Sequence, residues 1–256
     1  MCASVRPPIP HEGRDAWRKV MPHAERVDAH YHRLGQLVYP ASGVLVTTSA
    51  GGTWVAPANR VAWTPPGHAH QHRIYGETDI RSVAISLEFC AELPSHPCVF
   101  SVTGLAREAL LAVTDGRSAR AGRRDRICAV IVDELSELDI EPLHLPEPVD
   151  PCLRAVTEMV HAHPDDNSSL GQMAHTVGSS ERTLSRRFRD ELGMSFHQWR
   201  TLLRVQHAMI HLSNGLSVSH TAVELGWANP SSFIDAFEAI IGQTPGRYVR
   251  LSRQNA

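Results

Sequence analysis

The chain has 256 residues, of which 42% are hydrophobic and 20% are charged, and its formal net charge at pH 7 is −2. This composition is ordinary for a soluble globular protein of two domains, and no apolar run reaches the ~18–20 residues that a membrane-spanning helix needs. The small net charge argues weakly against nucleic-acid binding, so such a function has to rest on local charge placement.

The N-terminus and the cysteines indicate the cellular compartment. Residues 1–10 contain three prolines and lack the apolar core of a secretory signal. The five cysteines are odd in number, scattered and never spaced as C-x-x-C. This favours buried reduced thiols, with a redox sensor at Cys90 or Cys98 as the alternative. We therefore expect a cytoplasmic protein that is not bound to a membrane.

Short alternating apolar runs in the first hundred residues predict a β-rich domain. They cover residues 44–48, 53–55, 60–63 and 82–87, and Gly- and Pro-rich turn signals separate them. Many short strands at regular spacing favour a sandwich or a barrel.

A group of histidines and one glutamine stands out among these strands. Strand alternation places His30, His32 and Gln36 on one face, and His70 and His72 share a face in the same way. The pattern resembles the two motifs of the cupin barrel. The resemblance implies that His30, His32, Gln36 and His70 hold a divalent metal ion. Gln36 stands where metal-binding cupins usually carry a glutamate, and losing that carboxylate weakens a site for a hard metal.

Three interpretations of this cluster stay open. The four residues fit a pocket for a small effector, with Trp63, Trp54 or Tyr39 nearby. They also fit a metal site that senses an ion or supports the structure. The third interpretation is an inherited motif whose histidines form hydrogen bonds inside the barrel. We expect His68 and His72 at the rim rather than among the ligands.

The apolar spacing becomes helical after residue 103. Leu105 and Ala109 begin one stripe, and Ile127, Ile131 and Leu138 lie on a second, beyond a break at residues 116–122. These helices either pack onto their own domain or pair with a second copy in a homodimer. We place a sensor and dimerisation domain at residues 1–140.

A proline-rich segment follows and predicts a linker over residues 141–149, because its three prolines favour an extended chain. Asp150 and Pro151 then fit the cap and first position of a helix. The second domain is expected at residues 150–256.

This second domain is helical and contains a repeat. The corresponding residues are Ala174 and Ala222, Gly178 and Gly226, Leu184 and Phe233, Phe188 and Phe237, and Gly193 and Gly242, offset by 48 or 49 positions. The small alanines allow close helix crossing, the glycines suit a tight turn, and the large apolar pairs anchor a second helix. Each unit is therefore predicted to be a helix-turn-helix. Ser195 and Gln198 predict a capping box that opens a long helix between the two units.

The repeat resembles the AraC/XylS family of transcription regulators. The matching segments are residues 184–188 (LSRRF), 193–195 (GMS), 223–227 (VELGW), 232–237 (SFIDAF) and 242–248 (GQTPGRY). The resemblance spans about residues 150–250 and implies an α+β protein of two domains. These are an N-terminal cupin-like β-barrel with appended helices and a C-terminal all-α domain of two helix-turn-helix units.

Carried over by position, the resemblance implies a first recognition helix at about residues 180–190. Arg182, Ser185 and Arg186 would face the bases, where arginine can bond bidentately to guanine. Arg187 and Arg189 would contact phosphate or solvent. These four arginines lie within eight residues. They provide the local positive charge that the whole chain lacks.

The second recognition helix is capped by Asn229 and presents Ser231, Ile234 and Asp235. Asp235 and Glu238 repel phosphate, so we expect weaker or indirect readout here, with Ile234 against a thymine methyl group.

Together these patterns predict a sequence-specific regulator of transcription whose activity responds to a small effector or metal in the barrel. Its expected partners are double-stranded DNA, a second copy of the chain and, for an activator, RNA polymerase. Two other functions stay open: a cupin metalloenzyme of the dioxygenase or isomerase kind fused to a DNA-binding domain, and a DNA-binding architectural protein without a sensor.

Overall fold

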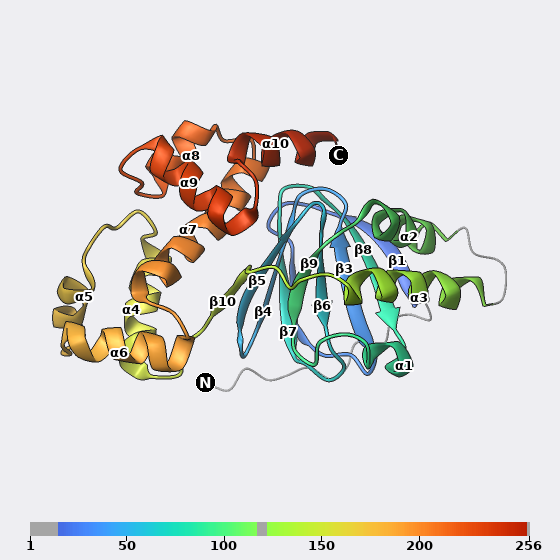
Figure 1. Cartoon of the computed structure of the whole chain (residues 1–256), viewed down its shortest axis with the longest axis horizontal. Coiled ribbons are helices and arrows are strands. Elements are labelled where there is room, and N and C mark those ends of the chain that lie inside the picture. The colour runs from blue at the N-terminus through green and yellow to red at the C-terminus, as the bar shows by residue number, and fades with distance from the viewer. Residues whose placement is uncertain (1–14, 117–121, 255–256) are drawn as a thin grey trace. The chain divides into compact units, whose positions relative to one another are not determined.

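The computed structural model describes residues 15–116 and 122–254, and the chain divides into two compact units (Figure 1). The first unit comprises the residues up to His144 and those from Leu251 on, and the second runs from Leu145 to Arg250. The segment predicted as a linker contains a short strand, β10 (His144–Pro146). Residues 1–14 and 117–121, which include most of the predicted break between the two helical stripes, lie outside the described part of the chain.

Two five-stranded sheets form the first unit. Their strand orders are β1-β8-β3-β6-β9 and β10-β5-β4-β7-β2, and the described pairs are antiparallel. The other strands are β1 (Ala16–Met21), β2 (Arg26–His30), β3 (Gly35–Pro40), β4 (Val44–Ser49), β5 (Gly52–Pro57), β6 (Arg60–Thr64), β7 (His70–Tyr75), β8 (Thr78–Ile85) and β9 (Cys98–Ser101).

The two faces of the first sheet differ because side chains alternate along its strands. Register between β3 and β6 places Leu37 opposite Trp63 and Gln36 opposite Thr64. Leu37 and Trp63 belong to the apolar core that packs against helices. Gln36 and Thr64 therefore lie on the other face, and Gln36 meets His70 of the second sheet there. The polar cluster is thus enclosed between the sheets.

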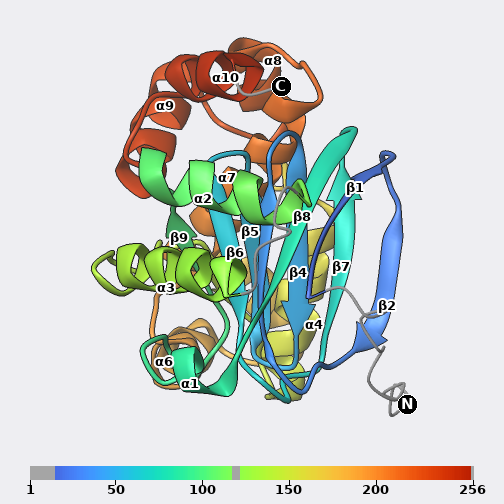
Figure 2. The same ribbon diagram turned by 90° about the vertical axis from the view of Figure 1, so that its right-hand side faces the viewer.

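Helices α2 (Gly104–Thr114) and α3 (Arg123–Ser136) cover the apolar face of the first sheet, as Figure 2 shows, and a short helix α1 (Leu87–Cys90) follows β8. Ile131 and Leu135 are fully buried in this core, and Ile127 and Leu138 pack against it. The stripe that suggested a homodimer is therefore used within its own domain. A homodimer stays a prediction, and this stripe does not supply its interface.

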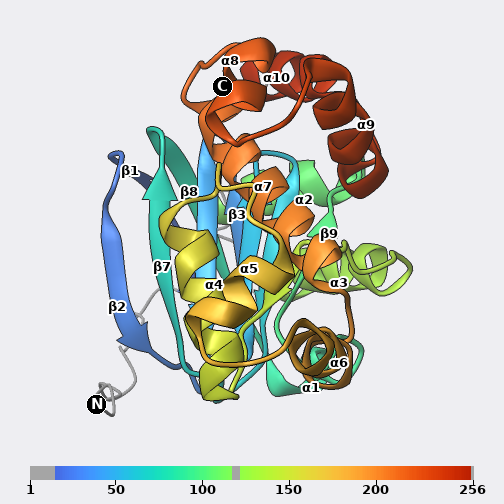
Figure 3. The ribbon, with the colours of Figure 1, turned by 90° about the vertical axis from the view of Figure 1, so that its left-hand side faces the viewer.

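The second unit contains seven helices among its described residues. They are α4 (Pro151–Ala162), α5 (Leu170–Thr176), α6 (Glu181–Leu192), α7 (Phe196–Ser213), α8 (Val218–Glu224), α9 (Pro230–Ile241) and α10 (Pro245–Gln254). Figure 3 shows α4, α5 and α6 grouped around one end of α7, and α8, α9 and α10 around the other. The fold is thus α+β, with a two-sheet β unit and a helical unit.

Local sequence signals account for the helix boundaries. The Asp150 side chain accepts hydrogen bonds from the amides of Cys152 and Leu153, which confirms the predicted cap of α4. Ser195 and Gln198 form the predicted capping box at the start of α7. No helix within the described ranges is both long enough and apolar enough to cross a membrane.

Candidate nucleic-acid interface and histidine cluster

The first helix-turn-helix consists of α5 and α6. Gly178 lies in the turn with φ of 65°, a left-handed conformation that favours glycine. Ser180 caps α6 by accepting a hydrogen bond from the Thr183 amide. Leu184 and Phe188 are fully buried, one helical turn apart, and they anchor α6 to the core of its own unit. The opposite face of α6 is therefore turned toward solvent.

Three arginines lie on that solvent face. Arg182, Arg186 and Arg189 are exposed, and Ser185 lies half-buried between them. These four residues line one shallow hollow together with Thr183 and Asp190. Nη1 of Arg189 donates to Oγ of Ser185 at 3.1 Å. The surface offers flexible cationic donors at the spacing of one helix face, which suits phosphate and base-edge acceptors.

Arg187 points to a different partner. Its Nη1 lies 2.8 Å from Oδ2 and 2.9 Å from Oδ1 of Asp150, the residue that caps α4. Hydrogen bonding by the Leu153 amide, with the charge of Arg187, holds the pKa of Asp150 below its usual range. Arg187 thus connects α6 to the start of α4, whereas Arg182, Arg186 and Arg189 line the hollow.

The second helix-turn-helix, α8 and α9, repeats the backbone of the first. Gly226 has φ of 71°, and Asn229 caps α9 by accepting from the Ser232 amide. Phe233 and Phe237 are fully buried and anchor the helix. Ser231 and Asp235 are exposed and Ile234 is half-buried, and residues 218–241 contain neither lysine nor arginine.

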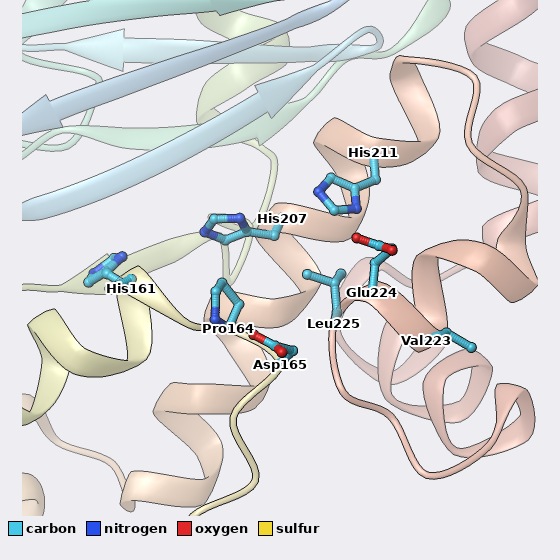
Figure 4. A pocket seen from close by; sticks show the side chains of 9 residues that line it. His161, Pro164, Asp165, His207, His211, Val223, Glu224 and Leu225 are labelled. Carbon is cyan, nitrogen blue, oxygen red and sulfur yellow. The ribbon is translucent and has the colours of Figure 1, made fainter.

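A polar pocket lies where α7 passes the C-terminal end of α4, the loop that follows it, and the C-terminal end of α8 (Figure 4). His207 and His211 project into it from α7, His161 from α4, and Glu224 from α8. Burial, with smaller contributions from His161 and His211, lowers the pKa of His207 to about 4. His207 is therefore neutral at physiological pH.

The predicted histidine cluster of the first unit is a real spatial cluster. His30, His32 and His70 are 3%, 6% and 2% exposed, and their ligand nitrogens all lie within 4.8 Å of one another. Nε2 of His70 lies 3.1 Å from Oε1 of Gln36, which is also buried. Burial lowers the pKa of His70 to about 4, so its imidazole is neutral at physiological pH.

Hydrogen bonds to backbone carbonyls fix the tautomers of two of these rings. Nδ1 of His30 donates to the Asp28 carbonyl at 2.7 Å, and Nδ1 of His70 donates to the His68 carbonyl at 2.8 Å. A neutral imidazole with a proton on Nδ1 carries its lone pair on Nε2. Both rings therefore turn a lone pair into the cluster, and that of His70 faces the amide oxygen of Gln36.

Three sequence-based expectations about this cluster need correction. Gln36 does not share a strand with His30, because β2 ends at His30 and Gln36 lies on β3 of the other sheet. His72 is not a rim residue: it is 8% exposed, and its ring centroid lies 4.9 Å from that of His70. Trp63 points to the opposite face of its sheet and donates from Nε1 to the Pro94 carbonyl. It therefore cannot contact an effector held between the sheets.

The fold and the paired units define the class of the protein as a DNA-binding protein with two helix-turn-helix units. A model of the family described as "Helix-turn-helix domain" matches residues 173–251. The regulator NimR of Escherichia coli is 31% identical over 222 residues, which cover 86% of this chain and 81% of NimR. The regulator RipA of Corynebacterium glutamicum is 38% identical over 95 residues, which cover 37% of this chain and 29% of RipA.

Among solved structures, ToxT of Vibrio cholerae matches with a TM-score of 0.41 at 10% identity, covering 93% of this chain and 98% of ToxT. The chain belongs to the AraC-type family of helix-turn-helix transcriptional regulators. Its relatives are regulators and not enzymes, which sets the metalloenzyme alternative aside.

Proposed function

We propose that this regulator reads its DNA mainly through α6, with Arg182, Ser185 and Arg186 at base edges and Arg189 at phosphate. The observation that supports this assignment is the shared hollow on the solvent face of α6, into which these residues converge. Arginine bidentate to guanine contributes about 1–3 kcal/mol of discrimination per pair. Arg187 contributes to DNA binding indirectly, because it orients α6 through Asp150.

The second recognition helix contributes less affinity in this proposal. Ser231 and Asp235 are exposed at its start, and Ile234 offers a methyl-bearing side chain for a thymine. The absence of lysine and arginine from residues 218–241 leaves α9 without a cation for phosphate. We propose that α9 enters the adjacent major groove and makes fewer contacts with DNA there than α6 does.

We further propose that the N-terminal unit is a sensor and that a divalent transition-metal ion is its ligand. His30, His32 and His70 would supply imidazole nitrogens, and Gln36 would supply an amide oxygen. Imidazole-rich sets favour ions such as Zn²⁺, Ni²⁺ or Cu²⁺ over Mg²⁺ and Ca²⁺. The main support is the lone pair of His70 Nε2, which faces Gln36 Oε1 at 3.1 Å. Two acceptors at this separation suit a cation that both can ligate.

Binding regulates only if the ligand prefers one state of the protein. In this proposal the occupied cluster changes the affinity for DNA, and the bound ion supplies no catalysis. The affinity for the metal is expected to be moderate, since Gln36 leaves the charge of the ion without a carboxylate partner.

Titration with Zn²⁺ after chelator treatment tests the sensor. Wild type should bind one ion at the cluster, His30→Ala with His70→Ala should lose it, and Gln36→Glu should bind more tightly. His175→Ala, at an exposed position of α5, is the matched control. If wild type binds no ion at the cluster, the amide of Gln36 donates to His70 instead, and a small polar effector becomes the ligand to seek.

A mobility-shift assay on the intergenic DNA upstream of the protein's own gene, with and without Zn²⁺, tests regulation. We expect the metal to change the affinity for DNA in wild type and not in the double histidine variant. A homodimer, contact with RNA polymerase as an activator, and a cytoplasmic location complete the proposal. Sedimentation and transcription in vitro test the first two.

A further inference from the structure

Arg204 is a buried cation in the interior of the helical unit. It lies in the middle of α7 and is 6% exposed. Its Nε donates to the carbonyl of Pro164 at 2.7 Å, and its Nη2 donates to the carbonyl of Asp166 at 3.0 Å and to Oδ1 of Asn167 at 3.1 Å. These acceptors belong to the loop that leads into α5, so Arg204 holds the entry to the first helix-turn-helix.

The same guanidinium also reaches the second helix-turn-helix. Nη1 of Arg204 donates to the carbonyl of Gly226 at 3.4 Å, and Nδ2 of Asn167 donates to that carbonyl at 3.0 Å. Gly226 is the turn residue between α8 and α9. A Cβ atom on Gly226 would lie 2.2 Å from the carbonyl oxygen of Asp165. The loop before one unit and the turn of the other are therefore in direct contact, with Arg204 bonded to both.

The chemistry of this contact requires arginine. Burial lowers the pKa of Arg204 to about 10, so the group stays charged at physiological pH. A planar guanidinium has five donors in a fixed fork, whereas a lysine ammonium is a point charge on a flexible stem. One arginine can therefore satisfy carbonyls on two loops together, and a lysine at the same place cannot reproduce that geometry.

Besides this contact, the two helix-turn-helix units are connected by the packing of α8 and α9 against α7 and by the turn that follows α7. The chain leaves α7 through Asn214 and Gly215, and Gly215 has φ of 90°. Glycine there gives a turn with wide conformational freedom. We propose that Arg204 is a positioning residue that fixes the separation and orientation of α6 and α9, so that the protein reads two half-sites at one spacing.

The proposal rests on how linked modules bind DNA. Two recognition helices on one face of a duplex insert about one helical turn, ~34 Å, apart. The second contact adds affinity only when the geometry lets both modules engage together. A rigid connection therefore selects operators by the distance between their half-sites. The contacts to individual bases do not determine this distance.

Selection from a library of random-sequence duplexes measures this property directly. Wild-type protein should enrich a bipartite motif with one spacing. Arg204→Lys should still enrich each half-motif but accept several spacings, and its affinity for the wild-type motif should fall at least about tenfold. Asn167→Ala, at an exposed position, removes the Oδ1 acceptor of Arg204 and the Nδ2 donor to the Gly226 carbonyl. It should broaden the spacing in the same direction, to a smaller extent.

Arg200→Lys is the matched control. Arg200 lies one turn earlier on α7 and donates to the Ser168 carbonyl in the loop before α5, with no described bond to the Gly226 turn. This variant should keep the single spacing. The proposal is overturned if Arg204→Lys and Asn167→Ala keep the wild-type spacing and affinity. It is also overturned if they lose the half-motifs themselves, or if Arg200→Lys broadens the spacing equally.

Discussion

The two helix-turn-helix units share a backbone and differ in charge. Each has a left-handed glycine in its turn, a polar cap on its second helix and two buried anchors at i and i+4. The solvent face of α6 carries Arg182, Arg186 and Arg189, whereas α9 carries Asp235 and Glu238 and no basic residue. The repeat thus preserves the features that fold each unit while the outward residues diverge.

In the proposed assignment, folding and DNA readout use separate positions on the same helix. The anchors at Leu184 and Phe188 correspond to Phe233 and Phe237, all of them fully buried. Substitutions on the opposite, solvent-exposed face do not disturb that core, so the residues proposed to contact DNA can change freely. We therefore expect the two recognition helices to contribute unequally, with α6 providing most of the affinity for DNA.

The largest expected effect comes from Arg182→Ala combined with Arg186→Ala. Losing two base contacts of about 1–3 kcal/mol each should weaken specific binding at least roughly 30-fold. Anisotropy titration on DNA selected by the wild type measures this loss. Ser231→Ala with Ile234→Ala on α9 is the matched comparison and should weaken binding less. An equal or larger loss from the α9 pair would break the assignment of unequal roles.

The two turn glycines should respond differently to alanine. Gly178 and Gly226 both have positive φ, which costs an alanine about 1–2 kcal/mol. A Cβ on Gly178 meets no atom within 4 Å, whereas one on Gly226 would lie 2.2 Å from the Asp165 carbonyl. We expect Gly226→Ala to lose about 2–5 kcal/mol of stability and Gly178→Ala about 1–2. Chemical denaturation measures both, and equal losses would contradict the tight contact at Gly226.

The connection between the two helix-turn-helix units should lose stability in acid, because burial lowers the pKa of His207 there. Its folded pKa is about 4 against an ordinary value of 6.5, so the unfolded chain binds the extra proton between these values. Stability is full above about pH 6.5 and falls as the pH drops toward 4, by up to about 3 kcal/mol. His207→Leu should make this part of the pH profile of thermal unfolding less steep and leave the part that comes from His70, whose folded pKa is also about 4. His175→Leu, at an exposed position of α5, should leave the whole slope unchanged. A wild-type slope in His207→Leu would contradict the assignment.

The smallest effect is expected at Asp235. Its carboxylate is exposed on the outward face of α9. Asp235→Asn removes repulsion from phosphate and should raise affinity for non-specific DNA about two- to fivefold at low salt, and less at high salt. Asp133→Asn, exposed on α3, is the control. No change, or weaker binding, would indicate that α9 lies away from the backbone of DNA.

Local signals in the sequence predicted much of the second unit. Asp150, Ser195 and Asn229 are caps whose partners lie within three residues, so spacing along the chain is sufficient to find them. The turn glycines follow from the same local rule. The predicted tight turns are confirmed, and Gly178 and Gly226 adopt a positive φ in them.

Features that depend on distant partners were missed or misplaced. Trp63 was assigned to the effector pocket because alternation does not say which face is the interior, and the register with Leu37 decides it. His72 was placed at the rim, although β4 covers it through Thr47. Arg204 had no sequence signal, since its acceptors are mostly backbone carbonyls of residues 22 to 40 positions away.

A base-pair substitution scan across the selected operator tests the central claim most directly. The half-site read by α6 is first identified as the one whose contribution disappears in the variant carrying Arg182→Ala and Arg186→Ala. We predict losses of about 1–3 kcal/mol per pair there and distinctly smaller losses in the half-site of α9. Equal losses in the two half-sites, or larger ones under α9, would contradict the unequal roles of the two units.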